Sequence, residues 1–360
     1  MISEIQVVEH FKSWAGLNSP DIYVTHEHIK AIQVRENLVF ADVEVGYPCL
    51  SQTETIRSTI ETYLKTLHPS LQVQLNIKIV IVPHKVRHGL KLMPGVKNII
   101  AVASGKGGVG KSTTAVNIAL ALQREGASVG ILDADIYGPS IPTMLRLEGK
   151  PSVEEGEKGW WPLTAYGIEA ISIGVLIEED TPMVWRGPMV TSALEQLLRE
   201  TRWRNLDYLV VDLPPGTGDI QLTLSQKVPL SGAVIVTTPQ DIALLDVKKG
   251  LKMFEKVNVP ILGIIENMSL HTCSQCGHTE AIFGSGGGHH LAEDYNAPFL
   301  GQLPLDIKIR EHSDSGTPIV ISDPLSPITQ AYINLARRMS IQLAHTGREF
   351  SHKFPQIIMQ

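Results

Sequence analysis

The residues best suited to chemistry lie in one glycine-rich stretch, which begins at Gly105. It reads Gly-Lys-Gly-Gly-Val-Gly-Lys-Ser and fits the phosphate-binding pattern G-x-x-x-x-G-K-[S/T]. The glycines let successive backbone N–H groups turn toward phosphate oxygens, Lys111 brings a positive charge to the β- and γ-phosphates, and the Ser112 hydroxyl can bind Mg²⁺. We therefore predict an ATP site formed by Gly105, Lys106, Gly107, Gly108, Val109, Gly110, Lys111, Ser112 and Thr113.

The segments around this stretch have the pattern that a nucleotide site needs. An apolar run at 98–104 has the length of a buried strand, and residues 113–124 have the apolar spacing of a helix. Helical stretches then separate further strand-like runs at 129–133, 207–212, 233–237 and 261–265. This alternation predicts an α/β fold with a doubly wound, mostly parallel sheet, which places ligands beyond the carboxyl ends of its strands.

Acidic residues end two of the predicted strands. Four apolar or aromatic residues precede Asp212, which we predict to hold Mg²⁺ together with Ser112. Asp135 lies just past the strand that ends at Asp133, where it could position the attacking water; alternatively, both residues cap a loop or a helix start. Gly216 could place its backbone N–H against the γ-phosphate, as switch loops do.

Lys106 is a second lysine in the glycine-rich stretch, directly after its first glycine. Because it leaves a tight turn, its side chain could reach phosphates held by a partner subunit, or it could be a solvated loop lysine. We assign Lys106, Lys111 and Asp135 to ATP hydrolysis. Hydrolysis is expected to be slow, since no side chain of obvious base strength accompanies Asp135.

Cys273 and Cys276 lie three residues apart, so that a tight turn can bring both thiolates to one metal. A c-type haem site would need histidine where Gly277 stands, and a thioredoxin-like pair should open a helix in its own βαβ unit. Structural zinc with His271 and His278 is a further alternative.

An iron–sulfur cluster held by four thiolates needs two cysteines more than this pair provides. The chain has three cysteines, and the third, Cys49, forms no second pair. Two-fold symmetry can supply the missing ligands, because a loop near the axis meets its own copy. The pair therefore predicts a homodimer with a [4Fe–4S] cluster between its subunits.

The N-terminal region has a different pattern from the rest of the chain. Helical and strand-like stretches follow one another in the order α-β-β-α-β, at residues 7–14, 29–34, 38–45, 53–67 and 71–81. We predict a small α+β domain over 1–83, a basic linker over 84–96, the nucleotide-binding domain over 97–345 and a C-terminal tail over 346–360.

Charge and hydropathy narrow the classes of partner. The formal net charge is −6, so no basic field favours nucleic acid. No apolar run has transmembrane length, and Glu4 and Glu9 stand where a signal peptide needs a basic start. The stripe of Ile328, Tyr332, Leu335 and Met339 on a last helix suits core packing better than membrane binding. We expect a cytoplasmic protein with neither nucleic acid nor membrane as partner.

The glycine-rich stretch together with Asp133-Ala-Asp135 resembles the deviant Walker A ATPases, which include MinD, ParA and the nitrogenase iron protein. Three further motifs look like those of the Mrp/ApbC iron–sulfur cluster carriers: Trp185-Arg-Gly-Pro-Met189, Asp212-Leu-Pro-Pro-Gly-Thr-Gly-Asp219, and Glu266-Asn-Met-Ser269 followed by Cys273-x-x-Cys276. The resemblance covers roughly residues 95 to 345.

The resemblance implies an ATP-binding homodimer that carries a [4Fe–4S] cluster, receives it from cluster donors and passes it to apo iron–sulfur proteins. It also implies that Lys106 reaches the other subunit's nucleotide and that Asn267 contacts adenine. The N-terminal region is similar in layout to a small domain of iron–sulfur assembly proteins. Its Pro48-Cys49 order reverses the usual Cys-Pro pair, which favours a buried structural thiol at Cys49.

Two other functions fit parts of the sequence. A spatial organiser of the MinD or ParA kind would bind membrane or nucleoid in its ATP state, and the acidic balance does not support it. An ATPase with a purely structural zinc site is the second. The cysteine pair favours the carrier.

Overall fold

The computed structural model describes residues 2–153, 159–176 and 187–348. The chain forms two compact units, one of Met1–Ile81 with Arg124–Gly126 and one of Val82–Gln123 with Ala127–Gln360. Trp185 and Arg186 of the motif Trp185-Arg-Gly-Pro-Met189, and residues 349–360 of the expected tail, lie outside the described residues. The domain boundaries expected from the sequence stay predictions.

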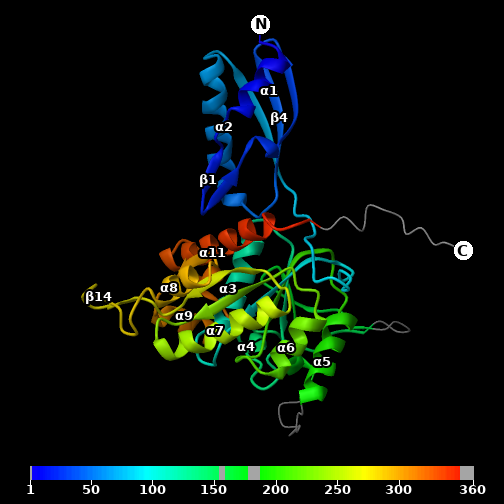
Figure 1. Ribbon diagram of the computed structural model, residues 1–360, viewed down its shortest axis with the longest axis vertical. Coiled ribbons are helices and arrows are strands. Elements are labelled where there is room, and N and C mark those ends of the chain that lie inside the picture. The colour runs from blue at the N-terminus through cyan, green and yellow to red at the C-terminus, as the bar shows by residue number, and fades with distance from the viewer. Residues whose placement is uncertain (1, 154–158, 177–186, 349–360) are drawn as a thin grey trace, which may run out of the picture. The chain divides into compact units, whose positions relative to one another are not determined.

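The first unit is a small α+β fold, as predicted. Its elements are α1 (Glu4–Lys12), β1 (Leu17–Ser19), β2 (Ile22–Val24), β3 (Ile29–Arg35), β4 (Leu38–Val45), α2 (Thr53–Leu67) and β5 (Gln72–Ile79). In the sheet β3-β4-β5, β3 is antiparallel to β4 and β4 is parallel to β5. Strict alternation buries Val39, Ala41 and Val43 on the face that α1 and α2 cover (Figure 1). The hairpin β1–β2 was not predicted.

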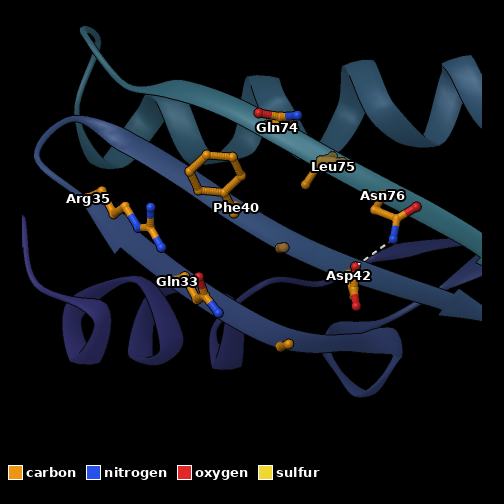
Figure 2. A pocket seen from close by; sticks show the side chains of 9 residues that line it. Gln33, Arg35, Phe40, Asp42, Gln74, Leu75 and Asn76 are labelled. Carbon is orange, nitrogen blue, oxygen red and sulfur yellow. Dashed lines mark hydrogen bonds between the residues drawn. The ribbon is translucent and has the colours of Figure 1, made fainter.

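The opposite face of this sheet is polar and hollowed. Gln33, Arg35 and Phe40 are among the side chains that line a hollow of about 550 Å³, as Figure 2 shows. Across it, the Asn76 amide donates to the Asp42 carboxylate over 2.8 Å. Cys49 is fully buried at the entry to a short 3-10 helix (Leu50–Gln52), which agrees with a structural thiol.

The second unit contains the predicted doubly wound sheet. Among the described residues it has eight strands in the order β15-β12-β11-β6-β10-β7-β9-β8, all parallel to their neighbours except the edge strand β8. Their apolar runs are buried on both faces, as parallel strands require. The strands are β6 (Val96–Ala103), β7 (Val129–Asp133), β8 (Leu163–Ala165), β9 (Ile168–Ser172), β10 (Leu206–Asp212), β11 (Gly232–Thr237), β12 (Ile261–Glu266) and β15 (Phe299–Gln302).

Helices connect these strands and cover the sheet (Figure 1). They are α3 (Lys111–Arg124), α4 (Ile141–Met144), α5 (Gly187–Glu200), α6 (Asp219–Lys227), α7 (Asp241–Lys256), α8 (Gly287–Asp294), α9 (Ile307–Asp314), α10 (Ile319–Ser322) and α11 (Pro327–Ala344). The predicted stripe on α11 is buried in the core through Tyr332, Leu335 and Met339. Within the described ranges, no helix is both long enough and apolar enough to cross a membrane.

The register of the sheet brings several polar residues to one edge. At the carboxyl end of β10, Asp212 lies opposite Asp133 of β7 and opposite Val102 of β6. Glu266 of β12 lies opposite Thr237 of β11 at the same edge. The glycine-rich stretch leaves β6 there, so that the phosphate loop is flanked by the ends of the neighbouring strands.

Candidate functional site: phosphate loop and cysteine arm

The phosphate loop connects β6 to α3, and its shape depends on its glycines. Gly108 and Gly110 have φ angles of +81° and +82°, a region that side-chain-bearing residues avoid. At Gly105, a Cβ atom would lie 2.6 Å from the backbone of Asp246, so the loop packs directly on α7. A Cβ at Gly107 would meet nothing within 4 Å. The loop is held on its α7 side and open where phosphate is predicted.

Lys111 lies between two carboxylates in the interior of the site. Its Nζ is 2.7 Å from Asp212 Oδ1 and 3.8 Å from Asp135 Oδ2. The Lys111 side chain is 6% exposed and that of Asp212 is fully buried. Burial raises the pKa of both carboxyl groups, and the Lys111 charge opposes that rise. The cation and one predicted Mg²⁺ ligand are therefore in contact.

The residues predicted to hold Mg²⁺ fit the ion. Asp212 Oδ2 is buried and has no hydrogen-bond partner among the described residues. The Ser112 hydroxyl lies 3.3 Å from Lys111 Nζ, in the same cluster. Hydroxyl and carboxylate oxygens are the ligands that Mg²⁺ takes from proteins at phosphate sites. An unsatisfied carboxylate oxygen beside a hydroxyl matches that donor set.

Asp133 holds the loop that carries Asp135. Its Oδ1 accepts from the Asp135 N–H over 3.1 Å, and its Oδ2 accepts from the N–H groups of Ser140 and Ile141 and from the Ser172 hydroxyl over 3.1–3.2 Å. Burial and the Asp212 charge raise the pKa of Asp133 to about 7. Asp133 thus caps the loop and the start of α4, which is the alternative considered for both residues. The Asp135 carboxylate lies near Lys111 instead, and its predicted role with water stays a prediction.

A cavity of about 420 Å³ lies beside Asp135. Tyr137, Pro214 and Pro215 line it together with the start of α6. Asp135 itself is one of the residues that line this cavity. Gly216 follows the two prolines, and its N–H donates to the Ser104 carbonyl over 3.0 Å. Its predicted contact with the γ-phosphate stays a prediction.

Asn267 packs against the phosphate loop, whereas Lys106 is part of it. The Asn267 side-chain amide donates to the Val109 carbonyl over 2.9 Å, so this residue supports the loop directly. The Lys106 carbonyl accepts from the Ser104 hydroxyl, and its ammonium group has no ion pair within the described residues. The predicted contacts of Asn267 with adenine and of Lys106 with a partner's nucleotide stay predictions.

The two cysteines occupy the tip of a short hairpin, β13 (His271–Thr272) and β14 (Thr279–Glu280), which extends from the second unit (Figure 1). The Cys273 N–H donates to the His278 carbonyl, and the Gly277 N–H donates to the Cys273 carbonyl, each over 2.9 Å. Cys276 is exposed and Cys273 is partly exposed. Backbone N–H groups of Cys276 and Gln275 lower the pKa of the Cys273 thiol, which favours the thiolate that metals bind.

The hairpin does not complete a metal site by itself. No group of three or more His, Cys, Asp or Glu side chains with metal-binding geometry occurs among the described residues. His271 Nδ1 is engaged with the Leu305 carbonyl at 2.9 Å. A closed four-ligand zinc site within one chain therefore lacks ligands in the described part. The predicted ligation of a cluster by the cysteine pair stays a prediction.

Residues 95–340 match the family described as NUBPL iron-transfer P-loop NTPase. The chain belongs to this family. It is 62% identical over 253 residues to the iron-sulfur cluster carrier protein of Escherichia coli K12, a match that covers 70% of this chain and 69% of that protein. The resemblance predicted from the motifs is thereby confirmed.

Solved structures agree with this membership. A nucleotide-binding protein of Archaeoglobus fulgidus in complex with ADP is 38% identical, with a TM-score of 0.57 over 66% of this chain and 91% of that one. The Pyrococcus furiosus cell division ATPase MinD, 21% identical with a TM-score of 0.50, covers 68% of this chain and 98% of its own. The MinD likeness shows the P-loop fold alone.

Sequence reasoning assigned no role to one buried carboxylate, which directly precedes Asn267. Glu266 ends β12, is fully buried and accepts hydrogen bonds from residues on both sides of the cysteine hairpin. Two features of the sequence could have pointed to this residue. Glu266 is a single acidic residue at the end of an otherwise apolar strand, and the glycine-rich stretch Gly-Ser-Gly-Gly-Gly follows at 284–288.

Proposed function

We propose that this chain binds and hydrolyses ATP and carries a [4Fe–4S] cluster, held between two copies by Cys273 and Cys276 of each, to apo iron–sulfur proteins. The observation that carries the proposal is the pair of accessible thiols, one with a lowered pKa, on a hairpin without further ligands in the described chain. The E. coli relative, whose name is iron-sulfur cluster carrier protein, supports the same cargo.

A second copy of the chain is the simplest source of the missing thiolates. A two-fold axis near the hairpin would bring two pairs together and make four ligands. Leu270 and Ile282, on either side of the cysteines in the sequence, are 41% and 51% exposed. A partner hairpin would cover them as it completes the site.

The proposed hydrolysis uses positioning and charge. Lys111 neutralises charge on the β- and γ-phosphates, Asp135 orients the attacking water, and Lys106 of the partner subunit approaches the same phosphates. Ser112 and Asp212 hold Mg²⁺, which supplies further charge neutralisation when bound. Asp133 keeps Asp135 in place through the hydrogen bond between its carboxylate and the Asp135 N–H.

We place this activity in the cytoplasm, with cluster donors and apo-acceptors as partners and with neither nucleic acid nor membrane. The net charge of −6 supports the exclusion of nucleic acid. The small number of cysteines, none of them in a disulfide among the described residues, suits a reducing compartment.

Anaerobic reconstitution with iron and sulfide tests the cargo. The wild-type protein should turn brown and transfer its cluster to an apo-ferredoxin, and the double variant Cys273→Ser/Cys276→Ser should stay colourless while it binds ADP as tightly as iron-free wild type. Cys49→Ser is the matched control and should keep its iron, because Cys49 is buried in the first unit. Full iron occupancy in the double variant would place the cluster elsewhere.

A further inference from the structure

Glu266 anchors both ends of the segment that carries the cysteines. We call residues 270–285 the cysteine arm. Glu266 Oε1 accepts from the Ser269 hydroxyl over 2.7 Å, just before the arm, and from the Gly286 N–H over 3.0 Å, just after it. Glu266 Oε2 accepts from the Gly288 N–H over 2.6 Å. One buried carboxylate therefore ties the entry and the exit of the arm to the end of β12.

The surroundings of Glu266 are specific for a carboxylate. The Gln302 amide is a fourth donor, 2.9 Å from Oε1. A carboxylate only accepts, whereas a glutamine would turn an NH₂ group toward one of these donors. The chain just after the cysteine arm also packs closely against its neighbours. A Cβ at Gly288 would lie 3.0 Å from Glu266 Cβ, and one at Gly287 would lie 2.6 Å from the Leu244 side chain. Gly288 is thus explained by its close approach to Glu266, and Gly287 by its close approach to Leu244.

The same carboxylate lies one residue away from a contact with the phosphate loop. The Asn267 amide donates to the Val109 carbonyl, and a Cβ at Gly110 would lie 2.2 Å from Asn267 Nδ2. Met268 has a φ of +57°, a conformation that costs a residue other than glycine about 1 kcal/mol or more. The Ser269 hydrogen bond to Glu266 and the Ser269 N–H bond to the Leu303 carbonyl hold that turn.

We propose that Glu266 is a positioning residue that couples nucleotide occupancy of the phosphate loop to the placement of the cysteine arm. Phosphate binding moves the Val109 carbonyl, Asn267 follows it, and the turn through Met268 and Ser269 passes the movement to the Glu266 anchor. The inference rests on the proposed function, because the arm matters only if it holds the cluster. Coupling is reciprocal: cluster loading must change the affinity for nucleotide by the same factor by which nucleotide binding changes the affinity for the cluster.

Amide hydrogen exchange of the iron-free protein tests the coupling without a cluster. The matched variants are Ser269→Ala and Gln302→Ala, since each removes one hydrogen bond to the same oxygen and only Ser269 lies between Asn267 and the arm. At saturating Mg²⁺ and ADP, exchange of the Gly286 and Gly288 amides should change about fivefold or more in wild type and in Gln302→Ala. In Ser269→Ala and in Glu266→Gln the response should be lost.

Each possible result either supports or overturns the proposed coupling. An unchanged exchange rate in wild type with bound ADP, or an undiminished response in Ser269→Ala, overturns the inference. Either result leaves the cargo untouched, because iron and sulfide content measure the cargo separately. A second measurement compares ADP affinity of iron-free and reconstituted protein: wild type should show a difference of about fivefold or more, and Ser269→Ala should show none. Equal differences in both proteins would also overturn the inference.

Discussion

At the scale of single residues, the account depends on how buried charges are paired. Lys111 and Asp212 are a nearly dry ion pair at 2.7 Å, and the second oxygen of Asp212 has no partner in the described chain. Such a pair contributes little beyond its own desolvation, but the loss of one member leaves an uncompensated charge. Removal of one member of this pair should therefore lower the free energy of unfolding as well as impair catalysis.

Lys111→Ala should lower the free energy of unfolding of the nucleotide-free protein by about 3 kcal/mol, because it strands the buried Asp212 carboxylate. Lys106→Ala is the control from the same loop, and it should change that free energy by less than about 0.5 kcal/mol. Denaturant titration followed by a probe in the second unit measures both. Equal stabilities of the two variants would contradict the ion-pair interpretation.

At the scale of elements, the glycines of the phosphate loop differ in how strongly the structure requires them. Gly110 has a positive φ and abuts Asn267, whereas Gly107 has neither constraint. We expect Gly110→Ala to destabilise the protein by about 1–3 kcal/mol and to disturb the Asn267 contact. Gly107→Ala should leave thermal stability unchanged without nucleotide. Indistinguishable melting temperatures for both variants would show that the Gly110 constraint is absent.

The strands nearest the site could be predicted from the sequence, and the shorter ones could not. β7, β10, β11 and β12 carry buried apolar runs that end in a polar residue, and β6 ends in the apolar run 99–103, which is the pattern of buried parallel strands. β9 carries Glu169, which breaks its run and is held by the Arg204 backbone N–H. β15 has four residues, too few for a periodicity.

Among the site residues, too, some contacts could be predicted from the sequence and others could not. Lys111, Asp135 and Asp212 meet at one point because the loop and two strand ends share an edge, which motif order and strand alternation anticipate. The Glu266 anchor could not be foreseen, since its four donors come from segments that only tertiary folding brings together. Hydrogen bonds to a buried carboxylate from loop backbone leave no regular spacing in a sequence.

At the scale of the whole molecule, the proposal requires two copies that complete each other's sites. Lys106→Ala and Asp135→Ala should each hydrolyse ATP poorly alone, because one lacks the lysine given to its partner and the other lacks its own water-positioning carboxylate. Mixed dimers regain one working site, so an equal mixture should recover roughly a quarter of the wild-type rate. A steady-state phosphate assay of the mixture measures this. No recovery would mean that Lys106 acts on its own nucleotide.

The central claim is that two chains share one cluster through their cysteine pairs. Iron and sulfide per chain, measured together with the molecular mass of anaerobically reconstituted protein by light scattering, test it most directly. We predict a species with the mass of two chains that holds about four iron and four sulfide ions, and an iron-free double cysteine variant. A monomer with a complete, stable iron–sulfur centre would contradict the account.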